Sequence, residues 1–76
     1  MTVSEAVAER IIDLCDERNI TINRLCTISA VTQSTVNDII NKRSKNPGVA
    51  TIKKLCDGLS ITINDFFDSE LFCHLD

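Results

Sequence analysis

The stretch Thr21–Asn46, TINRLCTISAVTQSTVNDIINKRSKN, predicts two short helices joined by a tight turn. Apolar residues recur three and four positions apart over residues 22–28 and again over residues 33–41, as on one side of an α-helix. A threonine stands directly before each of these ranges, where its hydroxyl can cap a helix. Residues 29–31 are left to form the turn. We expect the remaining chain to pack around this pair of helices.

The second helix, residues 33–41, has one apolar side and a polar remainder. Val36, Ile39 and Ile40 form the apolar stripe. The other positions carry amide, hydroxyl and carboxylate groups, namely Gln33, Ser34, Thr35, Asn37, Asp38 and Asn41. Amide side chains can pair with adenine and hydroxyls suit bases or phosphates, so this surface is suited to the major groove of DNA. An ordinary amphipathic helix with a solvated polar side is the alternative for this helix taken alone.

A basic loop, KRSKNPG, follows this helix over residues 42–48. Its cations could complement the negative end of the helix dipole, or they could bind DNA phosphates. We expect phosphate contacts at both ends of the helix, from Thr32 before it and from Lys42, Arg43, Lys45 and Asn46 after it.

The net charge of −3 alone argues against a nucleic-acid partner, but its distribution does not. Residues 1–17 carry five carboxylates and one arginine, for −4, and residues 57–76 carry five carboxylates and no Lys or Arg, for −5. Residues 18–56 carry seven cations and one aspartate, for +6. The positive charge therefore coincides with the helix pair. A solvated surface with uneven charge is the alternative.

Three further helices are expected from the same periodicity, so the chain is predicted to be an all-α, compact five-helix bundle. Their ranges are about 4–18, 49–58 and 63–70, within a single domain over residues 1–76. Ser4 and Thr62 are suited to cap the first and the last of them. Asn19 and Gly58 are suited to end the first two.

The expected core consists of the apolar residues at helical spacing. It includes Ile12 in the first helix, Val31 in the turn and Val49 in the fourth helix. Phe66 and Phe67 are expected to point inward from the last helix and to dominate that part of the core.

Three apolar residues remain near the end of the chain, namely Leu71, Phe72 and Leu75. They either pack back on the domain or form a dimer contact, because a paired regulator needs a surface on which to meet. The sequence leaves both readings open.

Four cysteines raise the question of a disulfide framework or a metal site. Cys15, Cys26 and Cys56 each stand among apolar neighbours at helical spacing, and a free cysteine behaves as a small buried hydrophobe. No two cysteines have the short spacing of a zinc site, and the single histidine, His74, adjoins Cys73. We therefore expect structural thiols, no metal and no cofactor.

The sequence lacks the features of an enzyme or a membrane protein. It has no phosphate-binding glycine loop, and its one histidine lies in the tail rather than beside paired carboxylates. No apolar run approaches the roughly 18 residues of a membrane span, and the N-terminal MTVSEAVAER does not read as a signal peptide. We expect a non-enzymatic protein of the cytoplasm.

With the helices placed, the chain resembles the phage-repressor/Cro-type helix-turn-helix family, also called the xenobiotic-response-element (XRE) type, over about residues 8–67. The resemblance rests on Leu25, VTQSTV (31–36), Ile39, Asn41, the loop from Arg43 to Pro47, TIKKLC (51–56) and INDFF (63–67). It implies a lambda-repressor-like DNA-binding domain whose third helix enters the major groove. By position in that family, the base-reading residues would be Gln33, Ser34 and Asn37. The phosphate-binding residues would be Thr32, Thr35, Asn41 and the basic loop.

Three positions depart from the family pattern. Ala30 and Lys42 stand where glycine is usual, and Ile22 stands where a phosphate-binding glutamine is usual. A left-handed backbone at Ala30 would cost roughly 1–2 kcal/mol.

The function expected from the residues and the resemblance together is that of a sequence-specific DNA-binding transcriptional regulator, acting as a repressor. It would bind double-stranded DNA as a homodimer, on half-sites about one helical turn apart. The alternative is a protein-interaction module of the same fold, such as an antitoxin or a subunit that docks on another regulator. The acidic ends and the apolar tail motivate this alternative.

Overall fold

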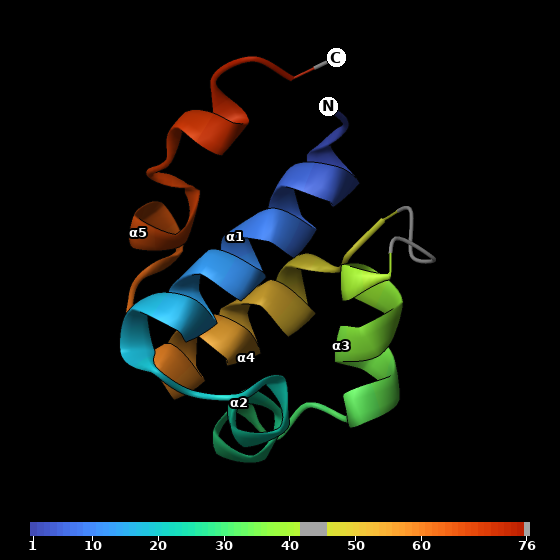
Figure 1. Ribbon diagram of the computed structural model, residues 1–76, viewed down its shortest axis with the longest axis vertical. Coiled ribbons are helices and arrows are strands. Elements are labelled where there is room, and N and C mark those ends of the chain that lie inside the picture. The colour runs from blue at the N-terminus through green and yellow to red at the C-terminus, as the bar shows by residue number, and fades with distance from the viewer. Residues whose placement is uncertain (42–45, 76) are drawn as a thin grey trace.

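The computed structural model describes residues 1–41 and 46–75 and contains the five expected helices. They are α1 (Val3–Arg18), α2 (Ile22–Ser29), α3 (Gln33–Ile40), α4 (Val49–Leu59) and α5 (Ile63–Phe67), followed by a 3-10 turn, η1 (Glu70–Phe72). α2 packs most extensively on α4, while α1 packs on α3 and on η1. Figure 1 shows α3 along one edge of the molecule and α5 with the C-terminal segment along the opposite edge. The all-α fold with α2 and α3 as neighbouring short helices is confirmed.

Threonine hydroxyls begin four of the five helices. The hydroxyls of Thr21, Thr32 and Thr62 accept hydrogen bonds from backbone N–H groups three residues later, as expected. The expected cap of α1 is wrong, because Thr2 rather than Ser4 caps it. The Thr2 hydroxyl accepts from the Glu5 N–H at 3.2 Å, and the Glu5 carboxylate accepts from the Thr2 N–H at 2.9 Å. This reciprocal arrangement needs a glutamate three residues after the cap. Glu5 stands there for Thr2, whereas Val7 stands there for Ser4.

The helix ends differ from expectation at one glycine. Asn19 ends α1 in the left-handed region with a φ of 54°, as expected. Gly58 does not end α4, which continues through Leu59 and is ended by Ser60 with a φ of 59°. A glycine near a helix end predicts a left-handed cap, but at this position the structure uses glycine for close packing instead.

One core cluster joins the helices. Its fully buried members include Leu25, Val36, Leu55 and Phe66, each with 0% exposure. The full cluster consists of Val7, Ala8, Ile11, Leu14, Cys15, Leu25, Cys26, Val36, Ile39, Ile52, Leu55, Cys56, Leu59 and Phe66. Burial of these side chains contributes most of the stability, at about 1.5–3 kcal/mol for each large one.

Three residues expected in the core are exposed. Val49 is 73% exposed, and Ile12 and Phe67 are 39% and 37% exposed. Helical spacing assigns Val49 to the apolar side of α4, but it is the first residue of that helix and lies at the margin of the packed region. Val31 is partly buried against the cluster, near its expected place.

α5 ends three residues earlier than expected. It stops at Phe67, and the Ser69 hydroxyl then accepts the Leu71 N–H to begin η1. Polar side chains of this kind satisfy backbone groups locally and compete with helix continuation. Arg10 of α1 also donates to the carbonyl oxygens of Phe66 at 2.7 Å and Asp65 at 2.8 Å, which fixes α5 against α1.

The C-terminal segment folds back on the domain through an aromatic cluster. Phe72 packs against the core cluster, and its ring lies 4.8 Å from that of Phe67 and 6.3 Å from that of Phe66. Leu71 and Leu75 are half-buried. Phe72 therefore contributes to this chain's own packing, and the reading of the segment as a dimer contact stays a prediction.

Candidate nucleic-acid interface

The polar side of α3 is exposed and its apolar side is buried. Gln33, Ser34 and Asn37 are all exposed, and they lie at spacings that bring them to the outer surface of one short helix. Val36 and Ile39 are 0% and 2% exposed, so they anchor the helix to the domain. The three residues expected to read bases are thus brought together and accessible to a partner.

The turn that leads into α3 requires a left-handed residue. Ala30 occupies that position with a φ of 55°. The backbone N–H of Val31 then donates to the carbonyl of Cys26 at 3.1 Å, which closes the end of α2. Expectation and structure agree that an alanine takes a conformation for which glycine is better suited.

Three hydroxyl groups gather at the start of α3. The Thr32 hydroxyl accepts from the Thr35 N–H at 3.3 Å and lies 2.8 Å from the Thr35 hydroxyl. It also lies 3.4 Å from the Ser34 hydroxyl. Thr32 and Ser34 are exposed, whereas Thr35 is half-buried. The Thr32 hydroxyl therefore accepts one hydrogen bond as the helix cap. The residue is still exposed, so a phosphate oxygen can approach it.

The other end of α3 leads toward the basic loop. Asn41 and Asn46 are exposed on either side of it. Lys42, Arg43 and Lys45, which are expected to contact phosphates, lie outside the described residues. Their assignment therefore stays a prediction from the sequence.

A small notch separates α3 from the start of α4. Its volume is about 130 Å³, and it is lined by Thr35, Asp38, Ile39, Pro47, Gly48 and Thr51. Pockets for drug-sized ligands or cofactors measure about 300–1,000 Å³. The notch is therefore too small for such a ligand.

Charge on the neighbouring helices is partly neutralised. Lys53 of α4 forms an ion pair with Asp57 one turn later, so its charge is less available than the composition of the central segment suggests.

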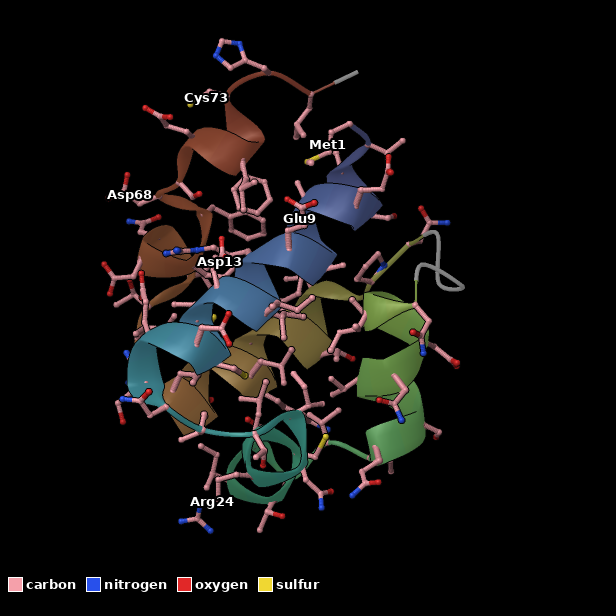
Figure 2. The ribbon with its side chains drawn as sticks, in the orientation of Figure 1. Met1, Glu9, Asp13, Arg24, Asp68 and Cys73 are labelled. Carbon is pink, nitrogen blue, oxygen red and sulfur yellow. The ribbon has the colours of Figure 1, made fainter. Side chains whose placement is uncertain are left out.

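Arg24 of α2 is exposed, and Figure 2 shows its side chain extending away from the body of the molecule. In the same view Asp68 lies on the side opposite to α3, so an acidic group of the C-terminal region stands away from the polar helix.

The cysteines form neither a disulfide nor a metal site among the described residues. Cys15, Cys26 and Cys56 are buried, and Cys73 is exposed. Desolvation raises the pKa of each buried thiol above its ordinary value of 9.0, so all three stay protonated near neutral pH. Their expected role as core thiols is confirmed.

Over the described part of the chain, no helix combines the length and apolar character needed to span a bilayer.

Sequence reasoning missed two features of this region. The first is the cluster of hydroxyl groups at the start of α3. In the sequence, Thr32, Ser34 and Thr35 were separate DNA-contact candidates, although three hydroxyl residues within four positions could have indicated the cluster. The second feature is a close approach between Ser29 and Gly58, for which no local sequence signal exists.

Known proteins are similar to this chain in sequence and in fold. Residues 10–70 match the model of the Cro/C1-type HTH DNA-binding domain. The HTH-type transcriptional repressor RghR of Bacillus subtilis (strain 168) is 39% identical over 57 residues, which cover 75% of this chain and 42% of that protein. This chain therefore spans about two fifths of that relative's length.

A solved structure matches the chain over nearly its full length. It is the crystal structure of the prophage Lp1 protein 11, with a TM-score of 0.86, 40% identity and coverage of 99% of both chains. The family match covers both helices of the exposed pair and favours a DNA-binding role over a purely protein-docking one. The chain belongs to the Cro/C1-type helix-turn-helix DNA-binding domain family.

Proposed function

We propose that this domain binds double-stranded DNA sequence-specifically and acts in transcriptional repression, with α3 lying in the major groove. The observation that carries the proposal is the exposed polar side of α3, where Gln33, Ser34 and Asn37 stand together on a helix anchored by buried apolar residues. Membership of a DNA-binding family supports it, and the relative named a transcriptional repressor supports the direction of the effect.

The proposed roles divide the surface into base contacts and phosphate contacts. Gln33 and Asn37 have amide groups that can pair with adenine, and the Ser34 hydroxyl can reach a base edge. Phosphates would be held by Thr32, Thr35, Asn41, Lys42, Arg43, Lys45 and Asn46. Phosphate contacts position the helix, and base contacts provide sequence preference.

The first experiment selects duplexes from a random DNA pool with the whole chain. A recovered consensus supports the proposal and supplies the target duplex. Recovery of no consensus at moderate salt, where non-specific phosphate binding is weakened, would contradict sequence-specific recognition.

Gln33→Ala and Arg43→Ala distinguish base contacts from phosphate contacts. The Gln33→Ala variant is expected to lose about five- to 150-fold in affinity for the selected duplex and little for a scrambled one, because one good base contact is worth about 1–3 kcal/mol. Arg43→Ala is expected to weaken binding to both duplexes alike. Asn64→Ala is the matched control, since it removes an exposed amide from α5. Equal loss on both duplexes for Gln33→Ala would exclude its base-reading role.

We further propose that two copies bind a two-fold operator, with half-sites about 34–36 Å apart. Leu71, Phe72 and Leu75 are the proposed contact, and Leu71→Asp should then lower the sedimentation-derived dimer fraction and the affinity for a two-half-site duplex together. An unchanged dimer fraction would remove this segment from the contact. The domain itself is proposed to be non-enzymatic and to work in the cytoplasm, without a cofactor.

A further inference from the structure

α2 and α4 approach each other closely at one pair of residues. A Cβ added at Gly58 would overlap the Ser29 hydroxyl oxygen and lie 3.0 Å from both the Cα and the backbone nitrogen of Ser29. Real Cβ atoms rarely meet other atoms at such distances. The two backbones therefore touch at a point where α4 has no side chain.

Ser29 is held at this point without a conventional partner. The residue is 6% exposed, and its hydroxyl oxygen has no hydrogen-bond partner among the described groups. A Cβ added at Gly58 would overlap this oxygen, so the Ser29 hydroxyl occupies the space that a side chain at residue 58 would need. The pair is thus packed backbone to backbone rather than joined by a strong bond.

The position of this contact connects it to the exposed helix. Ser29 is the last residue of α2, Ala30 follows it as the left-handed cap, and α3 starts at Gln33. α2 also makes its most extensive packing with α4, so α4 supports the first helix of the pair, while α1 packs on α3. A displacement of Ser29 away from α4 would be passed through a three-residue turn to the start of α3.

We propose that the contact between Gly58 and Ser29 sets where α3 stands on the domain, and that Gly58 is a positioning residue for base recognition. The inference rests on the proposed DNA-binding function and deepens it. Gly58 does not touch the polar side of α3 and acts only through α2. Because binding groups must be held within about 0.5 Å of their productive geometry, a displacement of about that size matters more for base contacts than for flexible cationic contacts.

The test compares the affinity for a selected duplex with that for a scrambled duplex of equal length. Gly58→Ala is expected to lower this ratio about fivefold or more, the smallest discrimination that one good base contact provides. Affinity for the scrambled duplex is expected to change little. Ser29→Ala alone is expected to keep the wild-type ratio, because it removes the hydroxyl and adds no atom.

The double variant Ser29→Ala/Gly58→Ala provides the rescue. It removes the overlap with the hydroxyl but keeps the two 3.0 Å backbone contacts, so its ratio should lie between those of Gly58→Ala and the wild type. If Gly58→Ala alone does not fold by circular dichroism, the double variant is expected to fold and to show a ratio below that of the wild type. A double variant with the full wild-type ratio would then overturn the proposal.

Thr62→Ala controls for loss of stability alone. The Thr62 hydroxyl caps α5 by accepting the Asp65 N–H at 3.0 Å, and Figure 1 shows α5 on the edge of the molecule opposite to α3. The variant should lower the unfolding free energy and leave the ratio unchanged at temperatures where the domain is folded. A folded Gly58→Ala with an unchanged ratio refutes the positioning role, whereas a wild-type chain that prefers no duplex refutes the proposed function instead.

Discussion

At the end of α2, Ala30 adopts a left-handed backbone conformation that suits glycine better. Its φ is 55°, and its methyl group is exposed, so it contributes no burial in return. We expect Ala30→Gly to raise the unfolding free energy by about 0.5–1 kcal/mol, because relief of the left-handed cost exceeds the entropy that glycine adds to the unfolded chain. Urea denaturation monitored by circular dichroism measures this change.

Asn19 provides the matched control for that substitution. It ends α1 with nearly the same φ of 54°, but asparagine tolerates this region far better than alanine. Asn19→Gly should therefore give a smaller gain than Ala30→Gly. Equal gains at both positions would mean that the left-handed cost at Ala30 is not specific to its side chain.

At the scale of the element, α5 depends on a carboxylate at its start. The Asp65 carboxylate accepts the Thr62 N–H at 3.1 Å, and the Asp65 N–H donates to the Thr62 hydroxyl at 3.0 Å. The hydrogen bond from the Thr62 backbone lowers the pKa of Asp65 below its ordinary value of 3.8, with smaller contributions from the Thr62 side chain and Arg10. A lowered pKa means that the folded state favours the charged form.

The sign of the pH dependence follows from this lowered pKa. The contribution of Asp65 to stability is fully present above pH 3.8, its ordinary pKa, and is lost as the pH falls through the lower pKa of the folded state. We expect Asp65→Asn to be less stable than the wild type at pH 7, with a difference that shrinks below pH 3.8. Thermal melts of both proteins across this range measure it. A difference that stays constant with pH would exclude the charge as its cause.

Most of the elements could be predicted from the sequence because their signals are local. Periodicity placed all five helices, and Thr21, Thr32 and Thr62 were recognisable caps because each precedes an apolar repeat. Gly58 could not be interpreted this way, since its role depends on Ser29, which lies on another helix. Val49 was misplaced because spacing gives the side of a helix but not how far the neighbouring elements cover it.

The candidate site was predictable to the same extent. The exposure of Gln33, Ser34 and Asn37 follows from the apolar stripe on the other side of α3, so residue spacing alone is enough to predict it. The interaction between the Thr32 and Thr35 hydroxyls depends on rotamers, which the pattern of residues does not contain. The contacts of the basic loop stay a prediction from composition.

At the scale of the whole molecule, carboxylates lie on the side away from α3, and we expect them to repel DNA only when salt screening is weak. The domain measures 32 × 23 × 21 Å, and Asp68 lies on the side away from α3 (Figure 2). The screening length is about 8 Å at 0.15 M salt and about 30 Å at 0.01 M. Carboxylates on the far side can therefore repel DNA across the molecule only at low ionic strength.

Neutralising two such carboxylates tests this expectation. Glu70 is exposed in η1, in the same C-terminal segment as Asp68. Asp68→Asn/Glu70→Gln should raise the affinity for selected and scrambled duplexes by the same factor at 0.01 M salt, and by much less at 0.15 M. Fluorescence anisotropy with labelled duplexes at both concentrations measures the effect. A gain that persists at 0.15 M would mean that these groups lie near the DNA rather than across the domain from it.

The burial of three of the four thiols gives the domain an internal reporter of its own opening. A maleimide should modify Cys73 within seconds to minutes, because that side chain is exposed, while Cys15, Cys26 and Cys56 become available only when the core separates. The fraction of chains that carry more than one maleimide then measures how many molecules have opened. Saturating duplex DNA should slow the second to fourth additions and leave the first untouched, so a mass spectrometer can follow complex formation without any engineered label.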